Sequence, residues 1–477
     1  GRRAPGSSPG THGVPHMTLL PPRPIIPLDG RCRAAVAGLG DFLSEAGLNR
    51  ARVHVEVEWL AYLTSHSLLG STPLAADELA ALREWAAGFG QAEIDRLAEI
   101  EATTQHDVKA VEYLVREQLT RQGLDRIAEL THVCCTSEDI NNLSYALTVK
   151  QAVETVWMPK LETVIVELAR QAEQYRELPM MSRTHGQPAT PTTLGKELAV
   201  FVYRLSRQVA QLGEIEYLGK FSGATGTFAA HLAADPAVDW PAVSREFVEG
   251  LGLTWNPLTT QIESHDWQAE LYGRIAHVNR ILHNLATDIW SYISIGYFRQ
   301  IPVAGTTGSS TMPHKVNPIR FENAEANLEL SNAILDSLAA TLVTSRWQRD
   351  LTDSSAQRNI GVGLGHSVLA LDNIARGLGQ IDAAPEVLAA DLDANWEVLG
   401  EAIQTVIRAE VAAGRSSIQD PYAALKELTR GRRIGQADLQ KFIAGLEIGE
   451  EARERLLALT PATYTGDAAR LLEYLRG

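Results

Sequence analysis

The segment LYGRIAHVNRILHNLATDIWSY, residues 271–292, lies in the most regular part of this 477-residue sequence. Its large apolar side chains recur every three or four residues, which is the spacing of one face of an α-helix. The apolar positions are Leu271, Ile275, Val278, Leu282, Leu285, Ile289 and Tyr292. A stripe of this length predicts a long helix that buries one wide face against other helices.

Helical patterns continue on both sides of this segment. One apolar stripe runs through 143–175 and passes Pro159, and another follows Asn317-Pro318, where Asn317 is expected to cap a helix and Pro318 to begin it. From about residue 35 onward Ala, Leu, Glu, Arg and Gln dominate, and alternating strand-like segments are scarce. The sequence therefore predicts an all-α protein built around a bundle of long helices.

Shifts in composition divide the chain. Residues 1–16, GRRAPGSSPGTHGVPH, contain almost nothing to bury, and we expect a tag or disordered extension that precedes a start at Met17. Near residue 380 the helical patterns become shorter and glycines punctuate them. We predict an N-terminal helical domain over 17–130, a central bundle over 131–380 and a C-terminal helical domain over 381–477.

The charge balance narrows the classes of partner. Lys and Arg number 43 against 58 Asp and Glu, so the formal net charge is −15. An acidic surface of this kind disfavours non-specific binding to nucleic acid or to anionic membranes. No apolar run approaches the ~18–20 residues of a membrane span. Three cysteines form no disulfide framework in a chain this long, so we expect the reducing cytoplasm.

Two polar loops interrupt the helical pattern, SRTHGQPATPTT (182–193) and VAGTTGSSTMPHKVNP (303–318). Polar loops on a rigid scaffold often carry binding and catalytic groups. His185 lies outside any apolar helical face, and an imidazole suits general acid–base chemistry near neutral pH. Lys315 beside a helix start suits a carboxylate or a developing oxyanion. The alternative for both is an ordinary surface loop.

A third segment, SRWQRDLTDSSAQRN (345–359), combines arginines with hydroxyl groups. A guanidinium binds phosphate or carboxylate through two hydrogen bonds at once. The same pattern also fits a solvated helix face with ion pairs four residues apart, and taken alone that interpretation is favoured. The glycine-rich run GATGT (223–227) is a further candidate for a loop beside a substrate.

Metal and nucleotide motifs are missing from the sequence. It contains no Walker motif, no HExxH and no Cys/His cluster at zinc spacing, so no metal site is predicted. The GVGLG run at 361–365 follows no strand pattern and is a weak nucleotide signal.

The run GSSTMPHKVNPIRFE strongly resembles the fumarase/aspartase superfamily signature SSxMPxKxNxxxxE. Other segments narrow the resemblance to the bacterial adenylosuccinate lyase family of the purine pathway, and together they cover nearly all of 27–477. These segments are TTQHDVKAVEYL, CTSEDINNLSYAL, RTHGQPATPTTLGKE, SRWQRDLTDSSAQRNIGVG and NWEVLGEAIQTV. The resemblance implies an all-α, three-domain lyase fold whose long-helix bundle forms the core of a homotetramer, with active sites shared between subunits.

The resemblance also implies a reaction. The family eliminates fumarate from adenylosuccinate to give AMP, and from the succinyl-carboxamide precursor SAICAR to give AICAR. By resemblance Ser309 is the general base and His185 the general acid, and no metal or organic cofactor is needed. Because removal of the β-proton puts charge on the neighbouring carboxylate, Lys315 and backbone N–H groups of its loop would stabilise the resulting aci-carboxylate.

Substrate-binding positions carry over residue by residue from the family motifs. The resemblance assigns the phosphate to Arg31, Arg349 and Arg358 with Ser354, and the succinyl carboxylates to Lys315 and Asn317. Further substrate contacts are implied for Gln105, His106, Asp107, Thr136, Ser137 and Gln261. Cys32 also matches a contact position, although the family pattern has Tyr there, and Gln105 stands where the pattern has Asn.

Other functions of related enzymes and of helical proteins fit the sequence less well. Argininosuccinate lyase needs a guanidinium site and no phosphate site, whereas the arginines of 345–359 and Arg31 favour a phosphorylated substrate. Fumarase and aspartase act on smaller substrates and leave those arginines without a purpose. A non-catalytic helical scaffold would first have lost Ser309, His185 or Lys315, and the sequence contains all three.

Overall fold

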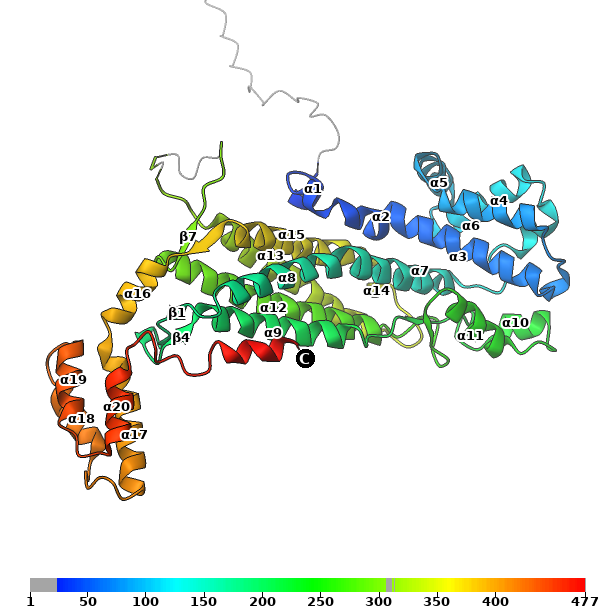
Figure 1. Cartoon of the computed structure of the whole chain (residues 1–477). Coiled ribbons are helices and arrows are strands. Elements are labelled where there is room, and N and C mark those ends of the chain that lie inside the picture. The colour runs from blue at the N-terminus through cyan, green and yellow to red at the C-terminus, as the bar shows by residue number, and fades with distance from the viewer. Residues whose placement is uncertain (1–23, 306–310, 313, 477) are drawn as a thin grey trace, which may run out of the picture.

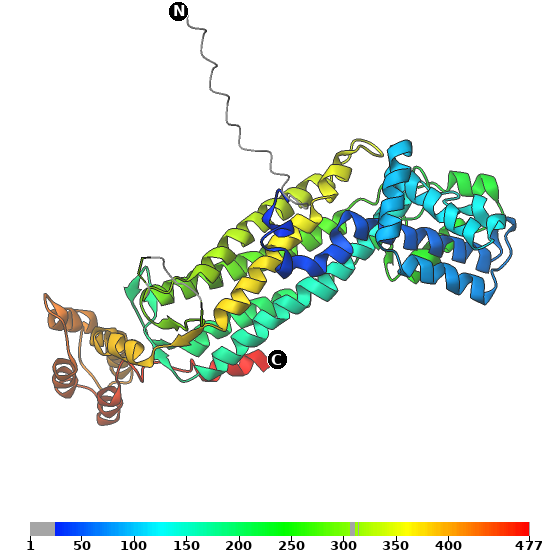
Figure 2. The ribbon, with the colours of Figure 1, turned by 90° about the horizontal axis from the view of Figure 1, so that it is seen from above.

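The structure is a computed structural model, and it describes residues 24–305, 311–312 and 314–476. Most of it is helical, and the longest helices lie side by side in an elongated bundle in both views (Figure 1; Figure 2). The helices of residues 45–121 lie at one end of the bundle, and the helices of residues 400–458 lie at the other. The predicted all-α fold with a central long-helix bundle is confirmed.

The bundle buries the apolar faces that the sequence predicts. Its helices are α7 (Ser137–Ala152), α8 (Met158–Gln174), α9 (Leu194–Leu212), α12 (Asp266–Ser294), α13 (Ile319–Leu342) and α15 (Ile360–Leu378). Helix α13 packs against α12 and α15, and α8 packs against α9 and α15. The stripe of α12 is completely buried at Leu271, Ile275, Val278, Leu282, Leu285 and Ile289. A π-helical turn over Val153–Trp157 joins α7 to α8.

Helix α13 begins one residue later than the sequence predicts. Its first residue is Ile319, and Pro318 takes the capping position with a non-helical ψ of 50°. A tight turn precedes it, in which the Ile319 N–H donates to the Asn317 carbonyl (2.8 Å). The expectation that Asn317 caps and Pro318 begins the helix is therefore wrong by one position.

A polar chain crosses the apolar core and joins four helical segments. Trp157 donates to the Ser367 hydroxyl (2.8 Å), which donates to the Asn279 side-chain carbonyl (2.7 Å). The Asn279 amide donates in turn to Ser331 (2.9 Å). Because an unpaired polar group in the core costs free energy, this chain favours one register of α12, α13 and α15 over others.

The N-terminal helices form a second cluster of buried apolar residues, beside the bundle core. They are α3 (Glu45–Ser65), α4 (Ala76–Ala87), α5 (Gln91–Thr104) and α6 (Asp107–Arg121). The short helices α1 (Arg33–Val36) and α2 (Gly40–Leu43) precede them and contact α15.

The C-terminal helices form a third cluster of buried apolar residues. They follow α16 (Pro385–Asp393) and are α17 (Gly400–Ala412), α18 (Pro421–Thr429), α19 (Gln436–Ala444) and α20 (Glu450–Ala458). The chain then returns to the bundle, where a 3-10 helix, Arg470–Arg476, packs on α9 with Leu472 buried (Figure 1). The division at 130 and 380 stays a prediction.

Short strands connect the helices in four two-stranded pairs within the described residues. The antiparallel pairs are β1 (Pro179–Met180) with β4 (Thr192–Thr193), β2 (Arg183–Thr184) with β3 (Gln187–Pro188), and β7 (Phe298–Gln300) with β8 (Ile381–Ala383). The parallel pair is β5 (Leu218–Gly219) with β6 (Thr254–Trp255). The remaining helices are α10 (Ala229–Ala234), α11 (Trp240–Gly250) and α14 (Thr352–Gln357).

Different helices begin and terminate at the two ends of the bundle. At the α14 end, α7 and α12 begin and α13 terminates; at the β7 end, α8 and α12 terminate and α9 and α13 begin (Figure 1). Helix α12 has 29 residues, so the two ends lie about 43 Å apart along it. None of the helices in the described part of the chain is long and apolar enough to cross a membrane.

Candidate active site

A cavity of about 820 Å³ opens at the α14 end of the bundle. Its lining comes from Arg52 on α3, the start of α6, the start of α7, the loops that follow β5 and β6, and the α13–α14 connection with α14. Eight of the predicted substrate-binding residues are among its lining, namely His106, Asp107, Thr136, Ser137, Gln261, Arg349, Ser354 and Arg358. The fold therefore gathers motifs that lie far apart in the sequence.

Two of these motifs, those that contain His106 and Thr136, lie at the starts of helices. His106 caps α6, and its Nδ1 accepts from the Lys109 backbone N–H (3.1 Å), so a neutral imidazole carries its proton on Nε2. Thr136 caps α7, and the Asp139 carboxylate accepts from the Thr136 N–H (2.9 Å). Gln105 ends α5 in the left-handed region with φ of 55° and is exposed next to His106.

The cavity arginines are held by carboxylates. Arg349 lies 2.8 Å from Glu138 and 3.7 Å from Asp353. Arg358 lies 2.9 Å from Asp107 and 3.3 Å from Glu45. Each guanidinium is thus oriented by anionic partners at the cavity wall, a geometry that a bound phosphate could share or replace.

Asp107 lies between two arginines. Its carboxylate is 3.0 Å from the nearly buried Arg52 and 2.9 Å from Arg358. Burial opposes the charged form, but the two guanidinium groups outweigh burial and hold the pKa of Asp107 below its usual value. The carboxylate therefore stays ionised and fixes both arginines.

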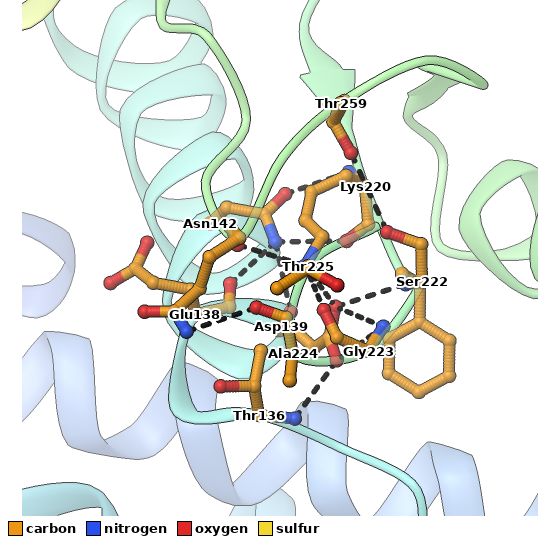
Figure 3. Close-up of polar contacts among 12 residues, drawn as sticks. Thr136, Glu138, Asp139, Asn142, Lys220, Ser222, Gly223, Ala224, Thr225 and Thr259 are labelled. Atoms are coloured by element: carbon orange, nitrogen blue, oxygen red, sulfur yellow. Dashed lines mark hydrogen bonds and ion pairs between the residues drawn. The ribbon is translucent and has the colours of Figure 1, made fainter. Parts of the chain in front are cut away.

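A buried ion pair holds the GATGT loop (Figure 3). The side chains of Lys220 and Asp139 are 0% and 1% exposed, and their charged atoms are 2.8 Å apart. The ammonium also donates to the carbonyls of Gly223 and Gln261, each at 2.8 Å. Asp139 accepts from the backbone N–H groups of Ser222 and Gly223 at 3.0 Å. The pair therefore anchors the start of the GATGT loop.

The anchored loop reaches the cavity. Ala224 and Thr225 of the GATGT run line it. The Gln261 side-chain amide donates to the Ala224 carbonyl (3.0 Å), which orients Gln261 at the cavity wall.

His185 and the described residues of the signature segment just before α13 lie at the β7 end instead. His185 is exposed at the tip of the β2–β3 hairpin, and Lys315 is exposed and Asn317 half-buried just before α13. Ser309 lies outside the described residues. One chain alone therefore keeps His185, Lys315 and Asn317 away from the cavity.

Arg31 and Cys32 lie in neither group. They precede α1, whose neighbours are on α15, and they do not line the cavity. Arg31 is exposed, whereas Cys32 is half-buried and packs against the bundle core. Within the described ranges, no group of three or more His, Cys, Asp and Glu side chains is arranged to hold a metal ion.

Comparisons with known proteins match this architecture. Residues 33–332 match the family model described as Lyase, and 345–465 match the one described as Adenylosuccinate lyase C-terminal. The Escherichia coli K12 adenylosuccinate lyase is 48% identical over 454 residues, which cover 95% of this chain and 98% of that protein. The Vibrio cholerae adenylosuccinate lyase is 47% identical, with 94% and 98% covered. The chain belongs to the adenylosuccinate lyase family.

The family predicted from the signature motifs is thus confirmed, and with it the class of enzyme, a C–N lyase. Solved structures agree on the fold. A fumarate lyase from Mesorhizobium sp. BNC1 superposes with a TM-score of 0.73 at 21% identity, covering 92% of this chain and 97% of that one. A 3-carboxy-cis,cis-muconate lactonizing enzyme from Pseudomonas putida superposes equally well at 22% identity, covering 92% and 96%.

Sequence reasoning missed several residues of this adenylosuccinate lyase family member. Arg52 and Glu138 line the cavity and orient its charged groups, and Lys220 and Asp139 anchor its loop. A charged residue among apolar residues of a helix or loop could have indicated such roles, as Arg52 does in RARVHVEVEW. Charges in such places are paired when they are buried.

Proposed function

We propose that this chain eliminates fumarate from adenylosuccinate to give AMP, and from SAICAR to give AICAR. Its membership of the adenylosuccinate lyase family at 48% identity to a full-length relative is the observation that carries the proposal. The charged cavity adds support, because three arginines and a serine of the segment 345–359 line it together. The reaction would take place in the cytoplasm on small molecules, with neither nucleic acid nor membrane as a partner.

The cavity would hold the nucleotide part of the substrate. Arg349 and Arg358 with Ser354 would bind the phosphate, and His106, Thr136, Ser137 and Gln261 would contact the rest. The family motif also assigns Arg31 to the phosphate, although Arg31 does not line this cavity in its own chain. An anion of two negative charges can compete with the carboxylates that now hold these guanidinium groups. Gln105, Asp107 and Cys32 complete the proposed substrate contacts, with Asp107 acting through its hold on Arg358.

The elimination itself would use Ser309 together with the described residues at the β7 end. Ser309 would remove the β-proton, and His185 would protonate the leaving nitrogen. Lys315 and Asn317 would bind the succinyl carboxylates, and the fixed positive charge of Lys315 would stabilise the aci-carboxylate that forms. No cofactor takes part in these steps.

The two groups of residues must meet for this reaction to occur. They lie at opposite ends of α12, about 43 Å apart by its 29 residues. A homotetramer whose subunits place the β7 end of one chain at the α14 end of another would bring them together. We therefore propose a homotetramer with active sites shared between subunits.

A spectrophotometric assay tests the proposed substrate. Purified protein is incubated with adenylosuccinate, and release of AMP and fumarate is followed, with argininosuccinate as the control substrate. We expect turnover of adenylosuccinate alone, since only this substrate carries the phosphate. A folded tetramer without turnover, or one that cleaves argininosuccinate instead, would refute the proposal.

Arg349→Lys tests the phosphate site. Lysine keeps the charge but cannot form two parallel hydrogen bonds, so we expect kcat/KM for adenylosuccinate to fall about ten- to a hundredfold. The matched control is Arg245→Lys, which changes an exposed arginine paired with Glu249 on α11 and should leave kcat/KM unchanged. Equal kcat/KM values for the two variants would show that Arg349 does not bind the phosphate.

A further inference from the structure

The hairpin that carries His185 is too short to hold its own shape. Each strand has two residues, with Arg183 opposite Pro188 and Thr184 opposite Gln187. His185 and Gly186 form the turn with φ of 53° and 75°, so the histidine itself adopts the left-handed conformation that non-glycine residues seldom take. Isolated two-stranded hairpins are at best marginally stable, and a strained residue persists only when its surroundings hold it.

One leg of the hairpin is held by α16. Arg183 forms an ion pair with Asp391 at 2.6 Å, and the Tyr297 hydroxyl donates to the same carboxylate. The Asn395 amide donates to Asp391 from the end of the same helix (3.3 Å). Burial, and then the hydrogen bond to Asp391, raise the pKa of Tyr297, so the phenol keeps its proton and remains a donor.

The other leg is held by α17. The Thr190 hydroxyl donates to Glu401 (2.9 Å), and the Tyr464 hydroxyl donates to the same carboxylate oxygen at 2.5 Å. Tyr464 lies in the segment that leads from α20 back to the bundle. The two legs are also joined to each other, since Ser182 donates to the Thr190 carbonyl and the Ala189 N–H donates to the Ser182 carbonyl (2.9 Å).

Both anchors thus come from the part of the chain after β8. Asp391 lies on α16 and Glu401 in the first turn of α17, and each carboxylate has one contact with the hairpin and one with a tyrosine. Figure 1 shows α16 and α17 at the same end of the bundle as β1 and β4, the strands that flank the hairpin. The C-terminal helices therefore act on the histidine hairpin from two sides.

We infer that Asp391 and Glu401 are positioning residues that hold the His185 hairpin in its reactive geometry. This inference rests on the proposed role of His185 as general acid. A general acid must stay within hydrogen-bond reach of the atom it protonates, and a displacement of about 1 Å can lower the rate a hundredfold. The C-terminal helices would in this way set the rate of the chemical step without touching the substrate.

Asp391→Asn and Glu401→Met test the inference. Asparagine removes the charge that pairs with Arg183, and methionine removes the oxygen that accepts from both Thr190 and Tyr464. We expect each to lower kcat about ten- to a hundredfold while KM for adenylosuccinate stays within about twofold, because the nucleotide contacts lie at the other end of the bundle. The matched control is Glu386→Gln, which removes the exposed ion pair between α16 and Arg299 on β7 and leaves the hairpin contacts in place. Its kcat should equal that of the wild type.

The same substitutions in a His185→Ala background separate positioning from a general structural role. If Asp391 and Glu401 act through His185, they should lower the residual rate no further once the imidazole is gone. A further loss of the residual rate by the same factor would overturn the inference. Normal kcat values for both single variants, with His185→Ala inactive, would overturn it as well. A near-normal rate for His185→Ala alone would instead refute the proposed role of His185 as general acid. Failure of that proposal is therefore distinguished from failure of the present inference, which is measured on the Asp391 and Glu401 variants.

Discussion

His185→Ala is expected to lower kcat at least about a thousandfold while folding and assembly stay normal. The leaving nitrogen of the substrate must gain a proton, and loss of the imidazole would leave only water to supply it. The side chain is exposed at a hairpin tip, so its removal leaves no cavity in the core. The measurement is kcat with adenylosuccinate, beside circular dichroism and the molar mass of the assembly.

The same loss is expected for Ser309→Ala, since no proton would be removed from the substrate. Gln187→Ala is the matched control for the histidine variant, because this residue lies on β3 of the same hairpin and is exposed as well. It should keep most of the wild-type rate. A His185→Ala enzyme within tenfold of the wild type would contradict the assignment.

Mixing two inactive variants tests whether sites are shared. His185 and Arg349 lie at opposite ends of one bundle, so a shared site would take them from different subunits. After His185→Ala and Arg349→Ala tetramers are unfolded together and refolded, about a quarter of the sites should hold both native residues by random assortment in a closed oligomer. His185→Ala refolded alone is the control. Activity no higher than that control would count against sites shared between subunits.

The fold was predictable from sequence because its signal is local. The stripe from Leu271 to Ile289 repeats at helical spacing, and every one of its members is buried on α12. The start of α13 was missed by one residue because Asn-Pro fits a cap followed by a first helical residue, whereas Pro318 keeps a non-helical ψ of 50°. Such a choice depends on how the preceding loop approaches the bundle, and no local pattern encodes that.

The site was predictable only in part. Resemblance located Thr136, Gln261 and Arg349 at substrate positions, and the fold places all three around one cavity. Without the resemblance, the residue types and spacing of 345–359, the segment that contains Arg349, favoured a solvated helix face. Arg52 and Lys220 escaped notice because their roles come from partners in distant segments, Asp107 and Asp139. Pairing across the fold is not visible in a sequence read one segment at a time.

Lys220→Met is expected to lower the free energy of unfolding by about 3–5 kcal/mol, the usual effect of removing one partner from a buried ion pair. Methionine keeps an unbranched apolar stem but removes the ammonium, so Asp139 loses its counterion and the carbonyls of Gly223 and Gln261 lose their donor. The matched control is Lys196→Met, whose ion pair with Glu197 is partly exposed and should contribute about 0–1 kcal/mol. Urea denaturation of both variants gives the comparison.

Activity should fall along with stability, because the ammonium holds the cavity wall together. Without it, Gly223 and Gln261 are no longer tied to one point, and the contact of Gln261 with Ala224 loses its support. Asp139→Asn should be at least as harmful, since three backbone N–H groups and the ammonium converge on the carboxylate, whereas an amide offers a single oxygen. If either variant unfolds at the wild-type urea concentration, the buried pair makes no net contribution, and the cavity loop must owe its shape to the backbone hydrogen bonds alone.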